Sequence, residues 1–200
     1  MAGETIPNVE FANADALDQW LAANHDTSGS IWAILWKKAT PEKYIDRDTL
    51  VKTALRYGWV DSLPRTLDER RSKLLLSPRK KGSAWSAVNK RYIAQLKQEQ
   101  NLHPAGQAAV DAAIEDGSWS ALDGAEEGDI PADLDAALDA RPPARTNFEA
   151  FPKSAKRGIL EWIALAKKPQ TRAKRIAETA ELAERNERAL DWRAKKKGPR

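Results

Sequence analysis

Strand-like sequence in this chain is confined to the first 80 residues, and the residues after them have helical spacing. Residues 30–36 are strongly apolar and rich in β-branched or aromatic side chains, which predicts a largely buried strand. Residues 59–61, 65–67 and 73–76 are three more short segments separated by turn residues, typical of an antiparallel meander. The N-terminal part is therefore expected to be α+β.

Apolar residues at helical spacing predict helices both inside this first part and beyond it. Asp46 or Asp48 can cap a helix that ends at Gly58, a glycine in the position where a left-handed backbone is common. The segment from residue 83 to residue 96 has an apolar face at 3.6-residue spacing. Further helices are predicted near residues 15–21 and 107–116, from Pro131, over residues 154–168 and from Thr171, which can cap the last one.

These patterns predict a small antiparallel sheet with helices, packed against a mostly α-helical C-terminal half. The expected domains are an α+β unit at residues 1–100 and a helical region at residues 101–192. A basic tail at residues 193–200 is expected to be disordered.

The composition excludes several chemistries. The 200 residues contain no Cys, which removes disulfides, thiolate catalysis and Cys-based zinc sites. The first ten residues show no basic and apolar signal-peptide pattern, and no apolar run approaches the ~18 residues of a membrane span. A cytoplasmic location is expected.

Charge is distributed unevenly along the chain. Residues 153–200 carry 15 Lys and Arg against 6 Asp and Glu, whereas residues 101–140 contain ten acidic residues and no Lys or Arg. The basic end can bind an anionic partner such as nucleic acid, or it can pair with the acidic middle of the same chain. We favour the second interpretation for residues 153–190.

A first candidate binding site follows the sheet segments. Basic residues from Arg79 lead into a predicted helix start at Ser83, where free N–H groups and the helix dipole favour a phosphate or carboxylate. Ser83 can also act as a simple cap, and a tryptophan at this spacing can belong to the core. The candidate residues are Asp61, Arg65, Arg79, Trp85, Ser86 and Asn89.

A second candidate site surrounds the predicted start of the last helix. Pro169 separates two helices, and Arg172 and Arg175 share a face where guanidinium groups can grip an anion in a bidentate way. A solvated basic face and intramolecular pairing are the alternatives. The candidate residues are Lys167, Thr171, Arg172 and Arg175.

Familiar catalytic patterns are missing from the sequence. Neither His25 nor His103 has a nearby His, Cys or Ser partner, and no glycine-rich phosphate loop is present. We expect no catalytic residue, no metal and no cofactor, although a carboxylate-based enzyme remains open.

An ordered series of short motifs resembles the YdeI/OmpD-associated family, which is linked to bacteriocin protection. The resemblance implies a bacterial stress-resistance role and brings no established reaction with it. The motifs are Ile31-Trp32, Lys37-Lys38, Ala54 to Asp61, Arg65, Leu67-Asp68, Pro78-Arg79, Trp85-Ser86, Asn89, Arg91, Pro104 to Gly106, Gly117, Trp119, Pro131, Ala136 to Leu138, Ala166 to Lys168, Thr171-Arg172 and Arg175-Ile176.

The leading hypothesis is a bacteriocin-protection-type protein, not clearly catalytic, that binds a small anionic ligand or an acidic protein partner. A nucleic-acid-binding protein using the basic C-terminal helix is a less favoured alternative. An enzyme acting on an anionic metabolite is another, and it requires a carboxyl with a raised pKa near the arginines, such as Asp61 or Asp68. The oligomeric state stays open.

Overall fold

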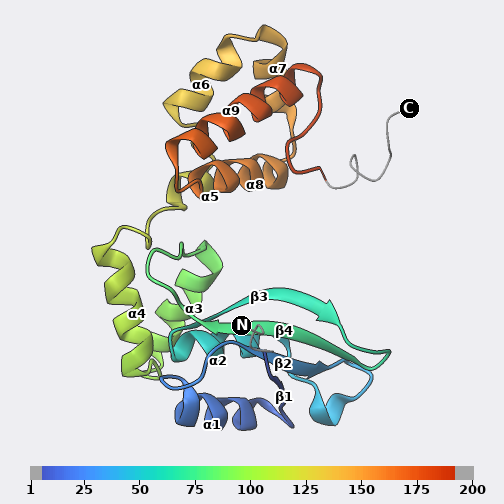
Figure 1. The fold of residues 1–200 in the computed structure, drawn as a ribbon, viewed down its shortest axis with the longest axis vertical. Coiled ribbons are helices and arrows are strands. Elements are labelled where there is room, and N and C mark those ends of the chain that lie inside the picture. Colours follow the sequence, from blue (N-terminus) through green and yellow to red (C-terminus); the bar gives the residue numbers. More distant parts are fainter. Residues whose placement is uncertain (1–5, 192–200) are drawn as a thin grey trace, which may run out of the picture. The chain divides into compact units, whose positions relative to one another are not determined.

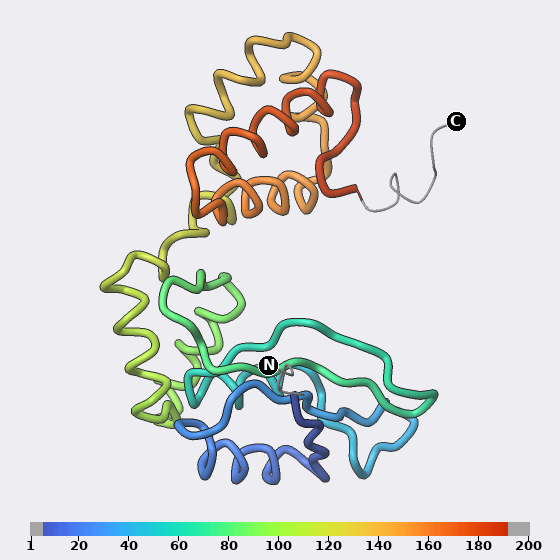
Figure 2. The backbone as a smooth tube through the Cα atoms, in the orientation of Figure 1, coloured from blue at the N-terminus to red at the C-terminus, as the bar shows by residue number. Residues whose placement is uncertain are grey.

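The computed structural model describes residues 6–191, and the predicted basic tail at 193–200 lies outside them. The chain divides into two compact units, Met1–Trp119 and Ser120–Arg200 (Figure 1). Figure 2 follows the backbone through both units, coloured by residue number. The first unit is α+β and the second is helical, so the expected fold class is confirmed.

The first unit is built on a four-stranded sheet with the strand order β1-β2-β4-β3. The predicted strand at residues 30–36 is confirmed as β2. Strand β1 runs parallel to β2, and the other two neighbouring pairs are antiparallel. The strands are β1 (Asn8–Glu10), β2 (Ile31–Trp36), β3 (Trp59–Thr66) and β4 (Arg71–Pro78).

The turn predicted between residues 61 and 65 is wrong, because the chain continues there as one strand. The register of β3 against β4 shifts between Asp61 and Pro64. A bulge of this kind accommodates Pro64, which cannot donate a hydrogen bond to a sheet. The parallel strand β1 was not expected from the sequence.

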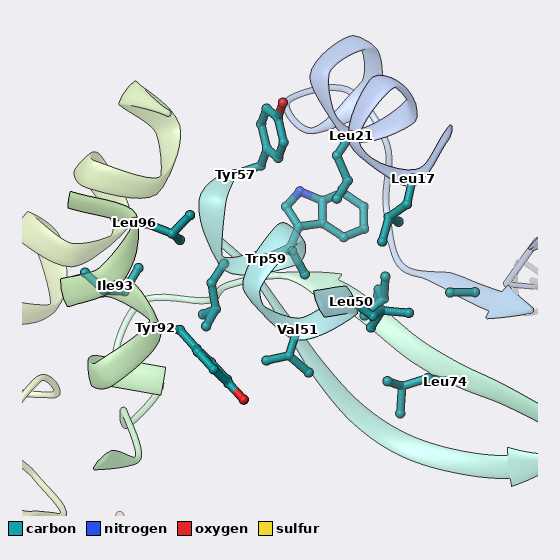
Figure 3. Close-up of a cluster of buried hydrophobic side chains, with 14 of the residues drawn as sticks. Leu17, Leu21, Leu50, Val51, Tyr57, Trp59, Leu74, Tyr92, Ile93 and Leu96 are labelled. Atoms are coloured by element: carbon teal, nitrogen blue, oxygen red, sulfur yellow. The ribbon is translucent and has the colours of Figure 1, made fainter. Parts of the chain in front are cut away.

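One face of the sheet packs against helices α1 (Ala14–Asn24) and α2 (Arg47–Arg56). Trp59, only 1% exposed, lies at the centre of this core beside leucines of both helices (Figure 3). Of the two aspartates expected as caps, Asp46 caps α2 by accepting a hydrogen bond from the Thr49 amide. Gly58 takes φ +76° beyond the helix end, as predicted. The short helix η1 (Pro41–Lys43) precedes α2.

Helices α3 (Ala87–Gln98) and α4 (Pro104–Glu115) complete the first unit. Tyr92, Ile93 and Leu96 of α3 enter the same core. Helix α4 approaches the end of α2 at Gly106, where an added Cβ would lie 2.2 Å from the Arg56 carbonyl oxygen. A glycine is therefore needed at this crossing.

The second unit has its own core, which includes Leu134, Phe148 and Ile163. Helix α6 ends at Asp139, before Arg141 and the two prolines that follow it. Pro142 begins helix α7, because proline suits the first helical turn. The helices are α5 (Asp123–Glu127), α6 (Ala132–Asp139), α7 (Pro142–Ala150), α8 (Lys153–Ala164) and α9 (Pro169–Glu184). Within residues 6–191, no helix has the length and apolar character that a membrane crossing requires.

Candidate functional site

The central arginine of the first predicted site contacts residues of its own loop. Cζ of Arg79 lies 3.6 Å from the ring centroid of Trp85. Nη1 of Arg79 donates to the carbonyl oxygens of Ser83 and Ala84 at 3.3 and 3.2 Å. Burial lowers the pKa of Arg79 to about 10, while the negative charge of Asp61 acts in the opposite direction. Arg79 therefore supports its own loop.

The predicted helix start at Ser83 is wrong, because α3 begins at Ala87 with Ser86 as its cap. Ser86 Oγ accepts a hydrogen bond from the Asn89 amide at 3.3 Å.

The basic loop before the helix binds a carboxylate from within the unit. Asp116 accepts from the Gly82 and Ser118 amides at 2.8 and 2.9 Å, and hydrogen bonding by Ser118 lowers the pKa of Asp116. The anion expected at this loop is thus supplied by the chain itself.

Asp61 and Arg65 have separate partners. Asp61 accepts a hydrogen bond from Nη2 of Arg47 at 2.9 Å. Arg65 is exposed, and its guanidinium carbon lies 5.3 Å from the centroid of the Trp32 ring. The six predicted residues thus form two separate contacts, one between Arg79 and Trp85 and one between Ser86 and Asn89. Asp61 and Arg65 take part in neither.

The arginines of the second predicted site are also engaged within their unit. Arg172 binds Asp133 through two hydrogen bonds of 2.6 and 2.8 Å, and this contact lowers the pKa of Asp133. Arg175 donates to the Trp162 carbonyl oxygen and lies over the Trp162 ring. This arrangement agrees with the intramolecular pairing favoured from the sequence. Lys167 is exposed. The capping role predicted for Thr171 is wrong, since α9 begins at Pro169 after Lys168.

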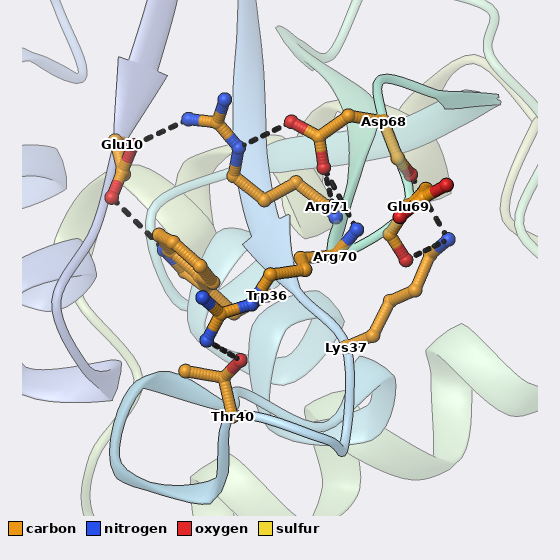
Figure 4. Close-up of polar contacts among 8 residues, drawn as sticks. All are labelled: Glu10, Trp36, Lys37, Thr40, Asp68, Glu69, Arg70 and Arg71. Atoms are coloured by element: carbon orange, nitrogen blue, oxygen red, sulfur yellow. Dashed lines mark hydrogen bonds and ion pairs between the residues drawn. The ribbon is translucent and has the colours of Figure 1, made fainter.

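A third basic cluster, which the sequence did not indicate, lies at the end of the sheet. Three cations surround the ring of Trp36: Lys43 at 4.8 Å, Arg70 at 5.3 Å and Arg71 at 5.5 Å from its centroid. Glu10 fixes the ring by accepting a hydrogen bond of 2.9 Å from Trp36 Nε1 (Figure 4). We call these five residues the Trp36 cluster.

The turn between β3 and β4 is held firmly beside this cluster. Asp68 accepts from the Arg70 and Arg71 amides and from Arg71 Nε, and the Arg71 contact lowers the pKa of Asp68. Lys37 Nζ donates to the Asp68 and Glu69 carbonyl oxygens (Figure 4). These bonds keep the cations of the turn close to the tryptophan.

A hollow of about 390 Å³ opens next to Trp36, and its walls are mainly apolar. Ile45 and Leu74 are buried there, and Leu35 is half-buried. The lining residues are Leu35, Trp36, Lys37, Lys38, Tyr44, Ile45, Arg47, Pro64, Ser72, Lys73 and Leu74.

Several cations around this region have no acidic partner. Within residues 6–191, no carboxylate lies at ion-pair distance from Lys38, Lys43, Arg65 or Lys73. Lys38 lies 5.8 Å from the Tyr44 ring and Lys73 lies 4.5 Å from the Trp32 ring. An apolar hollow with unneutralised cations at its rim fits an anion that also has an apolar part. The described residues contain no group of three His, Cys, Asp or Glu side chains that could hold a metal ion.

Two family models match the chain. Residues 9–109, about half of the chain, match the family described as Domain of unknown function (DUF8412). The chain belongs to this family. Residues 127–186 match the family described as Bacteriocin-protection, YdeI or OmpD-Associated (OmdA). No curated protein and no solved structure matches the chain.

The resemblance inferred from the sequence is thus confirmed over a smaller part of the chain than expected. It holds for residues 127–186, which include helices α6 to α9. The Trp36 cluster and its hollow lie within the match to the DUF8412 family.

The sequence contained one signal for the Trp36 cluster in this DUF8412 family member. Trp36 pairs with Arg71, and Ile34 pairs with Lys73, so the basic residues of β4 lie beside the apolar residues of β2. Arg71 and Lys73 at alternate positions of β4, and two tryptophans four residues apart in β2, would have indicated this face if the strand register had been known.

Proposed function

We propose that this chain is a bacteriocin-protection-type protein whose first unit binds an anionic ligand with an apolar body in the hollow beside Trp36. The match of residues 127–186 to the bacteriocin-protection family supports the role. The observation that carries the binding proposal is the hollow itself, where an apolar wall meets cations without acidic partners.

The walls and the rim of the hollow would hold different parts of such a ligand. Leu35, Ile45 and Leu74 offer an apolar surface, and burial of a ligand against them gains roughly 25 cal/mol per Å². Lys38, which is exposed at the rim, is placed to neutralise a carboxylate, sulfate or phosphate group. A purely polar anion would use the rim alone and bind weakly.

The alternatives have less structural support. A nucleic-acid site on the C-terminal helix would need Arg172 and Arg175, which bind Asp133 and the Trp162 carbonyl. An enzyme would need a carboxyl with a raised pKa near the arginines, whereas Arg71 lowers the pKa of Asp68.

Calorimetric titration of the full chain with naphthalene-2-sulfonate tests the proposal, with a naphthalene amine of opposite charge as the comparison ligand. We expect the sulfonate to bind and the amine not to bind. The variant Lys38→Glu should weaken sulfonate binding about tenfold. The exposed Lys97 of α3 provides the control, and Lys97→Glu should bind like the wild type. Equal binding of both ligands, or no binding of the sulfonate, would refute the proposal.

A further inference from the structure

The sheet has a second face that points away from the helices of its unit. Side chains alternate along a strand, so Trp32, Ile34 and Trp36 lie opposite the β2 residues that enter the core. Residues paired directly across two strands share a face. The register therefore adds Leu75, Lys73 and Arg71 of β4 to this face, and Arg65 of β3 pairs with Lys73.

The two tryptophans of this outer face are covered by cations. Trp32 is 9% exposed, yet it belongs to neither hydrophobic core. Lys73 and Arg65 lie 4.5 and 5.3 Å from its ring centroid. Arg70 and Arg71 lie around Trp36 (Figure 4), and Lys43 lies 4.8 Å from the centroid of its ring. Long basic side chains lie on these rings where a core would place apolar ones.

The charge of this face is positive and partly unneutralised. Lys43, Arg65 and Lys73 have no carboxylate at ion-pair distance in the part of the chain that the structure describes. Glu10, an acidic residue on the same face, is engaged with Trp36 Nε1 and Arg71. A phosphate backbone complements such a surface, because each neutralised phosphate releases counterions.

We propose that this outer face binds single-stranded nucleic acid. Bases stack on the rings of Trp32 and Trp36, which lie four residues apart on one strand, or about 13 Å. Arg65, Lys73 and Lys43 leave the rings and contact the phosphates. Stacking on aromatic side chains combined with a positive groove is the general mode of single-strand binding.

A single strand fits this surface better than a duplex. Stacking on a tryptophan needs an unpaired base, and a duplex hides its base faces. A pleated sheet face with cations close to its strands also has no protruding helix to enter a groove. This site meets the proposed ligand site at Trp36 and Lys73, which also line the hollow, and it extends beyond that site over Arg65 and Trp32, which do not.

Fluorescence anisotropy with a labelled twelve-nucleotide oligothymidylate tests the proposal on the full chain. We expect the single strand to bind at least tenfold more tightly than the same length of duplex and than poly-glutamate. Affinity should fall steeply between 50 and 200 mM salt. If poly-glutamate binds as tightly as the single strand, the face binds acidic proteins as well as it binds nucleic acid. If the duplex binds as tightly, charge alone explains the binding. Either result overturns the proposal.

Matched variants locate the contact. Arg65→Glu should weaken binding about tenfold and reduce the salt slope by about one, whereas Lys97→Glu should leave both unchanged. Trp36→Ala should weaken binding, and Trp36→Phe should retain most of it because a phenyl ring still stacks. Tyr44→Ala, which alters the hollow, should bind the oligonucleotide like the wild type. A loss in Tyr44→Ala as large as the loss in Arg65→Glu would overturn the assignment to this face.

Discussion

The basic residues on the outer sheet face of the first unit and the central arginines of the second unit have different partners. In the second unit, Arg145 contacts Asp135 and Asp139, and Arg172 contacts Asp133. In the first unit, Lys43 and Lys73 lie over tryptophan rings and have no acidic partner in the described residues. The C-terminal part is the more basic by sequence, yet its central arginines are neutralised by helix α6.

This difference shows that the residue opposite a cation decides whether the cation is available to a ligand. An exposed ion pair contributes about 0.2–1 kcal/mol, and an exposed cation over an aromatic ring contributes about 0.5–1 kcal/mol. The two arrangements thus stabilise the fold to a similar degree. They differ in that a ring leaves the positive charge unneutralised, whereas a carboxylate cancels it.

The largest expected effect comes from removing the central aromatic residue of each core. Trp59→Ala and Phe148→Ala should each cost about 3–5 kcal/mol, because both side chains are fully buried. Hydrogen exchange measured by mass spectrometry should show that protection falls only in the unit that carries the substitution. An equal loss of protection in both units would mean that the two units unfold together, which would contradict their treatment as separate units.

Two glycines give a matched pair across the units. Gly106→Ala should destabilise the first unit by about 1–3 kcal/mol, because its Cβ would meet the Arg56 carbonyl oxygen at 2.2 Å. Gly158→Ala in α8 meets nothing within 4 Å and should stabilise the second unit by about 0.5–1 kcal/mol. Urea denaturation checks both, and a neutral Gly106→Ala would show that the crossing of α2 and α4 is looser than described.

A smaller effect separates a paired arginine from an unpaired one. Arg172→Ala should cost up to about 1 kcal/mol, since Asp133 loses its partner, whereas Arg65→Ala should change stability little. The pKa of Asp133 is lowered in the folded state, so the contribution of this pair is present above pH 4 and is lost as the pH falls through that lowered pKa. The stabilities of wild type and Arg172→Ala should therefore converge in acid; a gap that persists there would exclude the ion pair as its cause.

The smallest expected effect is the pH response of the first unit. The rings of His25 and His103 lie 4.8 Å apart, and burial followed by the charge of His25 lowers the pKa of His103 below 6.5. Below pH 6.5 the unfolded chain binds the proton first, so stability should decline and then level off below the folded-state pKa. Thermal melting from pH 8 to pH 5 measures the decline, and His103→Gln should reduce it. If the melting temperature of His103→Gln falls with pH as steeply as that of the wild type, groups other than His103 cause the decline.

Local sequence predicted those parts of the fold that local forces decide. The strand at residues 30–36 and the left-handed Gly58 were correct, and Asp46 is one of the two caps that the local pattern allowed. Ser83 and Ser86 carry equivalent capping signals, and the choice of Ser86 follows from the burial of Trp85 between them. That choice depends on tertiary packing, which the local pattern does not contain.

The candidate site depended almost wholly on tertiary structure. Lys43, Arg70 and Trp36 meet because β2 pairs with β4 and because η1 follows β2. The sequence placed Trp36 at the end of an apolar strand that was expected to be largely buried. Arg172 and Asp133 are 39 residues apart, and a run of basic residues carries no information about so distant a partner.

The bulge in β3 has a consequence for how this protein can associate with others. Strand β3 forms one border of the sheet, and β1, which forms the other, is three residues long. Pro64 lacks an amide donor, and the register shift beside it bends the border strand. Both borders therefore offer poor templates for an incoming chain, which protects the fold against strand exchange and fibril growth.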